Sequence, residues 1–167
     1  MKTFRLVRSQ FLPVKIDRVF EFFADAGNLE QLTPPWLRFQ ILTPQPIEVE
    51  EGTVIDYRLR LRGVPVRWQS EITDWEPPYR FVDVQRKGPY RLWAHEHRFE
   101  AAGEGTLVTD DIEYAVPGGD IVNRWLVGPD LERIFAYRAQ WLTEWAYGLI
   151  GDGKGARFSE LLAGART

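Results

Sequence analysis

The sequence predicts an α+β fold in which a curved antiparallel sheet of about seven strands wraps around one long C-terminal helix. Apolar and polar residues alternate with period two through most of residues 53–116, as in strands with one buried face. Short turn sequences separate these runs, which favours antiparallel neighbours. After Gly118-Gly119 the apolar period changes to 3.6, which indicates helix. Short helices are expected directly after the first strand.

Length and composition indicate a single domain. The 167 residues are 44% hydrophobic, which suffices for one core. We expect residues 1–150 to form the domain and residues 151–167 to be a flexible tail. The net charge is −3 and no basic run exceeds a pair, so nucleic acid is not an expected partner. The chain has no cysteine, which excludes disulfides and thiol chemistry.

The N-terminal sequence and the lengths of the apolar runs predict a cellular compartment. The N-terminus lacks the apolar core of a signal peptide. No apolar run approaches the ~18 residues of a membrane span. We therefore expect a cytoplasmic protein without an integral membrane segment.

The first half of the chain shows local start and stop signals. Alternation in the first strand ends at Pro13, and apolar residues then recur at helical spacing from Ile16 to Phe23. Asn28 suits the cap of one further helical turn. The expected elements are a strand over residues 3–12, a helix over 16–25, a helical turn over 28–33, a weak strand over 37–42, and strands over 53–62 and 64–75.

The second half changes from strands to helices. Pro129 suits the first turn of the long helix, whose apolar stripe runs over residues 131–149. We expect Gly128-Pro129 to interrupt a shorter helical segment around residues 122–126. Three strands are expected before these helices, around residues 81–85, 93–99 and 108–114.

Both histidines of the chain lie on one strand, at His95 and His97. Side chains alternate across a strand, so these two share a face with Trp93 and Phe99. The two large apolar residues mark the buried face, and the histidines must accompany them. The sequence thus predicts buried imidazoles.

Turn lengths then predict which acids face the histidines. The first hairpin sets Asp83 opposite His95, and a two-residue loop in the next hairpin sets Asp110 opposite His97. One carboxylate is therefore available to each imidazole. We expect both pairs to project, together with Tyr114, into one cavity opposite the long helix.

The order of elements and three segments resemble the SRPBCC ligand-binding superfamily, which includes START domains, Bet v 1-like proteins and aromatic polyketide cyclases. The segments are Pro-Val-Lys-Ile-Asp-Arg-Val-Phe-Glu-Phe-Phe-Ala-Asp at 13–25, Trp-Glu-Pro-Pro-Tyr-Arg-Phe at 75–81, and Gly-Pro-Tyr…Trp…His…His…Phe within 88–99. The resemblance covers residues 3–148. It implies a helix-grip fold with an internal cavity between sheet and long helix, and it does not imply a particular reaction.

The resemblance and the polar face together predict a binding protein for a hydrophobic or aromatic small molecule, lipid-like or polyketide-like, in that cavity. Trp36 follows a double proline in a loop that would lie near the cavity mouth and could act as a lid. Arg138 falls on the apolar helical stripe. If buried, it needs a carboxylate or an acidic ligand group, and otherwise it extends to the surface. The expected ligand-binding residues are Trp36, Tyr57, Leu59, Trp68, Asp83, Gln85, Trp93, His95, His97, Asp110, Tyr114 and Arg138.

The alternative is an enzyme, and the sequence leaves the choice open. A cofactor-free polyketide cyclase or dehydratase needs only acid–base groups in a shaped cavity, and His95, His97 and Asp83 would be its catalytic residues. A third class is a protein-interaction module that uses the outward arginines 58, 60 and 62. Ligand identity and oligomeric state stay open as well.

A metal centre is the remaining alternative. His-x-His on a strand with an opposed carboxylate can supply three ligands of a zinc or iron site. However, a register that gives each histidine its own acid separates these ligands. We therefore expect no metal and no cofactor.

Overall fold

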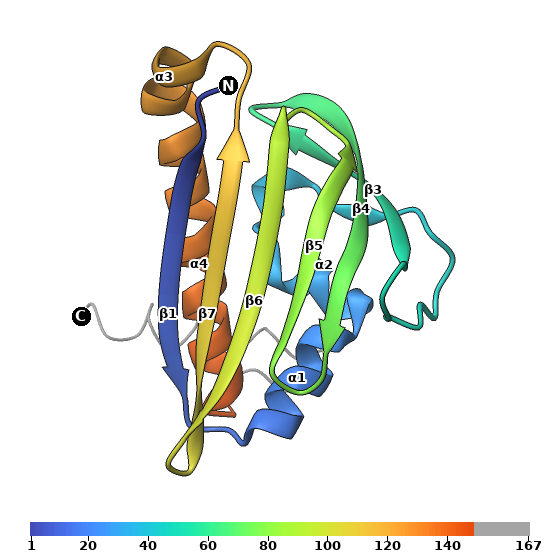
Figure 1. The fold of residues 1–167 in the computed structure, drawn as a ribbon, viewed down its shortest axis with the longest axis vertical. Coiled ribbons are helices and arrows are strands. Elements are labelled where there is room, and N and C mark those ends of the chain that lie inside the picture. The colour runs from blue at the N-terminus through green and yellow to red at the C-terminus, as the bar shows by residue number, and fades with distance from the viewer. Residues whose placement is uncertain (149–167) are drawn as a thin grey trace, which may run out of the picture.

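The computed structural model describes residues 1–148 and confirms the predicted fold class. One seven-stranded antiparallel sheet, in the order β1-β7-β6-β5-β4-β3-β2, curves around helix α4 (Gly128–Ala146) (Figure 1). The tail expected over residues 151–167 lies outside the described residues. The strands are β1 (Phe4–Leu12), β2 (Gln40–Ile41), β3 (Val54–Leu61), β4 (Val64–Glu76), β5 (Arg80–Lys87), β6 (Leu92–Ala102) and β7 (Gly105–Ala115).

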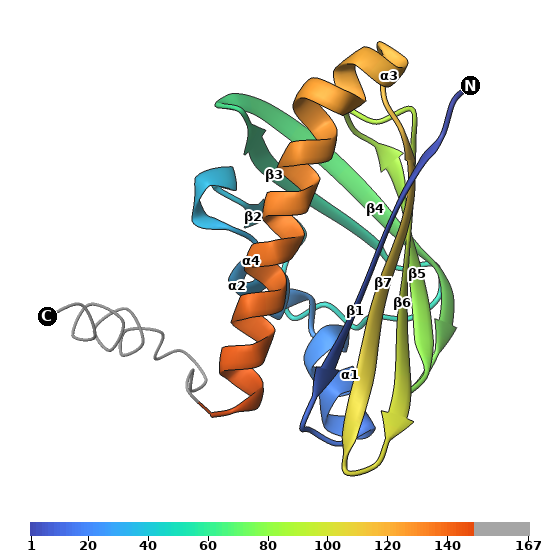
Figure 2. The same cartoon turned by 90° about the vertical axis from the view of Figure 1, so that its left-hand side faces the viewer.

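The helices cover the concave face of the sheet. Helix α4 runs across this face, while the short helices α1 (Ile16–Ala24) and α2 (Leu29–Leu32) lie beside its lower half (Figure 2). Interruptions of the β4–β5 register at Gln69/Ser70 and Ile72/Asp74 accompany the curvature, because a bulge bends its strand. Among residues 1–148, no helix is long and apolar enough to span a membrane.

The core is concentrated where α1, the β6–β7 hairpin and the C-terminal half of α4 meet. Val19 and Phe20 of α1 are buried against Phe99 and Val108 of the hairpin and Leu142 of α4. A second cluster joins the other end of α4 to β7. Members of both clusters also line the site described below.

The predicted break in the C-terminal helices is wrong, and the predicted strand over 37–42 is too long. Residues 119–146 are continuously helical: α3 (Gly119–Val122) passes into α4 through a π-helical turn over Asn123–Val127. A π turn widens the helix locally, which accommodates Pro129 without a break. The expected strand over 37–42 shrinks to β2, because Pro35–Leu37 form a 3-10 turn that ends in a left-handed Arg38.

The outward arginines 58, 60 and 62 are all exposed, and two of them make side-chain contacts at the surface. Arg58 donates to the side chain of Gln40 in β2, across the sheet. Arg62 instead reaches the start of α4, where its Nε lies 2.8 Å from Asp130 Oδ2. This ion pair connects the β3–β4 turn to the long helix.

Candidate functional site

A pocket of about 200 Å³ lies between the concave face of the sheet and α4. Aromatic rings form its wall on β3, β4 and β6. Tyr57 and Trp68 stack with ring centroids 6.0 Å apart, and Trp93 meets Trp68 edge-on at 5.3 Å. The polar atoms of this wall satisfy one another, because Ser70 Oγ accepts from Trp68 Nε1 at 3.1 Å and pairs with the Tyr57 hydroxyl at 2.8 Å. The wall therefore presents an apolar surface to the pocket.

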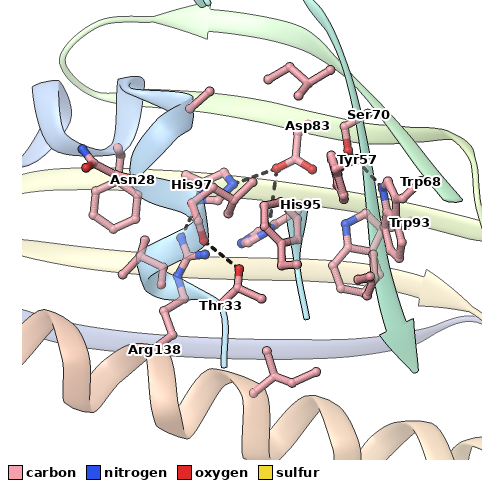
Figure 3. A pocket seen from close by; sticks show the side chains of 18 of the residues that line it. Asn28, Thr33, Tyr57, Trp68, Ser70, Asp83, Trp93, His95, His97 and Arg138 are labelled. Carbon is pink, nitrogen blue, oxygen red and sulfur yellow. Dashed lines mark hydrogen bonds and ion pairs between the residues drawn. The ribbon is translucent and has the colours of Figure 1, made fainter. Parts of the chain in front are cut away.

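A buried polar cluster lies in the same region as this aromatic wall (Figure 3). It comprises Asp83 of β5, His95 and His97 of β6, Asp110 of β7 and Arg138 of α4. Both imidazoles and Arg138 are less than a tenth exposed. Three consecutive strands and the long helix thus contribute to one cluster.

The strands pair in the predicted register, but each histidine side chain makes its shortest contact with the acid that lies opposite the other histidine. Asp83 pairs with His95 and Asp110 with His97 along the backbone. The shortest side-chain contacts are diagonal: His95 Nε2 lies 2.8 Å from Asp110 Oδ1, and His97 Nε2 lies 2.8 Å from Asp83 Oδ2. The two rings lie face to face between the acids, with centroids 3.7 Å apart. Diagonal neighbours are within reach of long side chains in an antiparallel sheet.

The cluster shifts the pKa values of the two histidines in opposite directions. Burial lowers the pKa of His95, the charge on His97 lowers it further, and Asp110 offsets only part of the shift. Burial also opposes a charge on His97, but hydrogen bonds with Asp110 and Asp83 outweigh it and raise the pKa of that ring. His97 therefore takes up a proton more readily than His95.

The carboxylates stay ionised despite their burial. Burial alone would raise the pKa of Asp110, yet the charge of Arg138 and the hydrogen bonds from both histidines hold it well below its ordinary value. Burial would also raise the pKa of Asp83, but its contacts with His97 and His95 hold that pKa below the ordinary value. With His97 protonated, two anions face two cations, so the cluster is neutral overall.

Arg138 is buried, as one of the two sequence-based alternatives required. Its Nη2 lies 3.4 Å from Asp110 Oδ1 and 3.5 Å from His97 Nδ1. Its Nε is buried and has no hydrogen-bond partner among the described residues. The guanidinium contacts the rings of Phe23 and Phe135 at 5.2 and 5.8 Å. Arg138 therefore lines the pocket and adds a buried positive charge to the cluster.

Most of the predicted ligand-binding residues line the pocket. They come from β3, β4, β5, β6 and α4, and those on one strand are two or four positions apart, because alternate side chains point to the same face of a sheet. These residues are Tyr57, Leu59, Trp68, Asp83, Trp93, His95, His97 and Arg138.

Four predicted residues do not line this pocket. Trp36 is turned outward by the 3-10 turn and packs on Tyr137 of α4, while Leu37 points inward. Gln85 holds the β5–β6 turn, and the Tyr114 hydroxyl donates to Asn123. Asp110 lies behind the histidines and borders a smaller cavity between β1 and α4.

Sequence reasoning missed the contribution of the segment after β1. Asn28 and Thr33 line the pocket, although their polar groups are used locally: Asn28 Nδ2 donates to Phe22 O instead of capping α2, and Thr33 Oγ1 donates to Leu29 O. No local pattern identifies these two residues. Phe135 also lines the pocket, and its place on the apolar stripe of the long helix was a usable signal.

Comparison with known families gives a direct result. A family model described as polyketide cyclase/dehydrase and lipid transport matches residues 3–140. The chain belongs to this family. The membership confirms the resemblance to the SRPBCC superfamily that the three sequence segments indicated. No curated protein matches the chain significantly.

Solved structures share the fold of this family member at low sequence identity. A START superfamily protein from Mycobacterium smegmatis is 14% identical with a TM-score of 0.64, covering 87% of this chain and 99% of that one. Major latex-like protein 151 from Panax ginseng is 15% identical with a TM-score of 0.62, covering 84% and 95%. A protein from Thermus thermophilus is 21% identical with a TM-score of 0.61, covering 88% and 99%. These likenesses concern the fold.

Proposed function

We propose that the protein binds a hydrophobic or aromatic small molecule that carries at least one polar group. The observation that carries this proposal is the shared position of an aromatic wall and a buried polar cluster on one pocket. Ligand sites combine a predominantly apolar lining with a few convergent polar groups. Membership in the polyketide cyclase/dehydrase and lipid transport family supports the same reading.

The pocket suggests how the ligand lies. An engineered cavity of about 150 Å³ accommodates benzene, so a pocket of about 200 Å³ suits a molecule of one or two rings. Its apolar part would lie against Trp68 and Trp93. Its polar group would lie beside the Arg138 guanidinium, which lines the pocket and carries only N–H donors.

The proposal is tested by native mass spectrometry of protein purified from its source, followed by titration with an apolar fluorophore. We expect a co-purifying small molecule or, in the empty protein, saturable fluorophore binding. Trp93→Ala should weaken that binding about tenfold or more, because large aromatic contacts each contribute on the order of 1–2 kcal/mol. Arg60→Ala, on an exposed position of β3, is the control.

Two results would contradict the proposal. One is a protein that binds no apolar probe although it is folded by circular dichroism. The other is an equal loss of affinity in Trp93→Ala and Arg60→Ala, since only the first side chain lines the pocket.

A second candidate function is acid–base catalysis without a cofactor, and one contact favours it. His95 Nε2–H donates to Asp110, which orients the ring and leaves Nδ1 as a basic nitrogen. Nδ1 lies 3.7 Å from Asp83 Oδ2, too far for a hydrogen bond, and His95 lines the pocket. A neutral imidazole in this position could remove a proton α to a carbonyl group.

This second function predicts exchange of α-protons in a bound 1,3-diketone. Deuterium incorporation followed by NMR should fall at least 100-fold in His95→Ala, in line with the contribution of a general base. Asp110→Asn should also slow exchange while fluorophore affinity survives. Exchange at the solvent rate in the wild-type protein would refute catalysis and leave ligand binding untouched.

A further inference from the structure

Each aspartate of the cluster lies close to one ring nitrogen of each histidine. Asp83 Oδ2 lies 2.8 Å from His97 Nε2 and 3.7 Å from His95 Nδ1. Asp110 Oδ1 lies 2.8 Å from His95 Nε2 and 3.3 Å from His97 Nδ1. Each carboxylate therefore faces one nitrogen of each ring, and the two carboxylates use different nitrogens.

We propose that Asp83, His95 and His97 bind a divalent transition-metal ion of the zinc type. One donor atom from each of the three residues lies within 4.8 Å of the others. Zinc binds such donors at about 2.0–2.2 Å, which separates tetrahedral donors by about 3.4 Å. The distances of 2.8 and 3.7 Å from Asp83 Oδ2 lie on either side of that value. Binding of the ion would therefore lengthen the first distance and shorten the second.

Asp110 supports the site from the other side of the rings. A histidine bound to metal commonly donates its second N–H to a carboxylate, which orients the ring. Asp110 Oδ1 is in position to accept from both histidines, and Arg138 Nη2 lies 3.4 Å from that same oxygen. The sequence predicted a separate acid for each histidine, which would keep the ligands apart. In the structure Asp83 Oδ2 instead lies near a nitrogen of both rings, so Asp83 could share an ion with them while Asp110 accepts from both.

The coordination would be incomplete on the pocket side. Asp83, His95 and His97 all line the pocket, whereas Asp110 does not. Three protein ligands with one open position are typical of catalytic zinc, while structural zinc has four protein ligands. Asp83 and Asp110 balance the charge of the ion, and Arg138 adds one positive charge. The fourth ligand is therefore a negatively charged oxygen. This inference does not depend on the proposed function.

The test uses tag-free, full-length protein treated with chelator and then titrated with Co²⁺. The chain has no cysteine and only these two histidines, so strong nitrogen ligation has one possible source. We expect one ion per chain, with the intense visible absorption of four- or five-coordinate cobalt, and displacement by Zn²⁺. Absence of stoichiometric binding, or the pale spectrum of six-coordinate cobalt, would overturn the proposal.

Variants of the cluster residues test which side chains bind the ion. His95→Ala and His97→Ala should abolish stoichiometric binding, and Asp110→Asn should weaken it by about 10- to 100-fold, as loss of an outer-sphere partner does. Asp111→Asn, the neighbouring carboxylate bound to Arg5 on the other face of β7, should bind as wild type. Near-UV circular dichroism checks folding. Folded Asp110→Asn protein with unchanged affinity would overturn the arrangement, even if the histidine variants do not fold.

A final comparison separates this proposal from ligand binding. Fluorophore titrations are repeated in excess chelator. Fluorophore binding without any cobalt binding contradicts the metal site and leaves the proposed function intact. Cobalt binding without fluorophore binding contradicts the proposed function and supports the metal site.

Discussion

Asp110 and Asp111 are adjacent in β7 and have opposite surroundings. Asp110 is enclosed with His95, His97 and Arg138, whereas Asp111 bonds the exposed Arg5 on the outer face. A buried ion pair that loses one member leaves an uncompensated charge, while an exposed pair contributes little. The two residues therefore form a natural matched pair for mutation.

We expect Asp110→Ala to lower the free energy of unfolding by about 3–5 kcal/mol, the usual effect of breaking a buried pair. Asp111→Ala should cost much less, because its partner Arg5 is two-thirds exposed. Urea unfolding of chelator-treated protein measures both changes. Equal losses would mean that the cluster around Asp110 is not the buried network described above.

The two histidines should shape the pH dependence of stability in metal-free protein. The folded-state pKa of His97 is raised, so its contribution is complete below the ordinary value of 6.5 and is lost as the pH rises through the folded value. The folded-state pKa of His95 is lowered. As the pH falls below 6.5, the unfolded chain binds a proton that the folded chain resists, and stability falls. The free energy of unfolding should therefore be greatest near pH 6.5.

Urea unfolding between pH 5 and 8, in the presence of chelator, tests this profile. Asp83, Asp110 and Arg138 face the rings, and the two carboxylates stay ionised over this range because their pKa values are lowered. His97→Gln should remove the decline above pH 6.5, and His95→Gln the decline below it. A profile that rises or falls throughout would contradict the assignment.

At the scale of elements, the β5–β6 hairpin depends on a residue that the sequence placed in the pocket. Gln85 Nε2 donates to Tyr90 O at 2.7 Å, and the Tyr90 N–H donates to Gln85 Oε1 at 3.2 Å. Gly88 has no space for a side chain, because a Cβ there would lie 2.2 Å from Gln85 Oε1. The turn in this way holds Tyr90 against Trp93, with ring centroids 4.8 Å apart, at the pocket wall.

Gln85→Ala should lower the free energy of unfolding by about 1–2 kcal/mol, because two hydrogen bonds of typical strength are lost. It should also weaken fluorophore binding severalfold, since Tyr90 lines the pocket. Lys87→Ala, an exposed residue of the same hairpin, is the control. If both variants bound the fluorophore equally well, the turn would not support the pocket.

At the scale of the whole molecule, the residues that stabilise the fold most are not the residues that line the pocket. Phe99 is 1% exposed in the core near α1 and contacts the rings of Phe20, Phe23 and Phe81. Leu59 borders the pocket instead. Removing a side chain from a packed core creates a new cavity, whereas removal at a pocket wall enlarges an existing one.

Phe99→Ala should therefore cost about 3–5 kcal/mol of unfolding free energy with little change in fluorophore affinity. Leu59→Ala should cost about 2 kcal/mol or less and change the affinity more strongly. Urea unfolding and fluorophore titration of both variants provide the comparison. The reverse order in either measurement would contradict this division.

The sequence by itself determined the parity and the connectivity of the fold. Strand side chains alternate with period two, so Trp93 and Phe99 could be buried only together with His95 and His97. The short turns between β3 and β7 made each of these strands pair with the next, and the observed β5–β6 and β6–β7 registers follow. These properties depend on local geometry and on pattern, which a single sequence contains.

Only the tertiary structure decided how the cluster is connected. His95 bonds Asp110 and His97 bonds Asp83, against the order of the backbone pairs, because the rings stack and reach their diagonal neighbours. Arg138 joins them from α4. Such contacts depend on side-chain rotamers and on the distance between helix and sheet. Both are decided by packing between segments far apart in the chain, which no local pattern records.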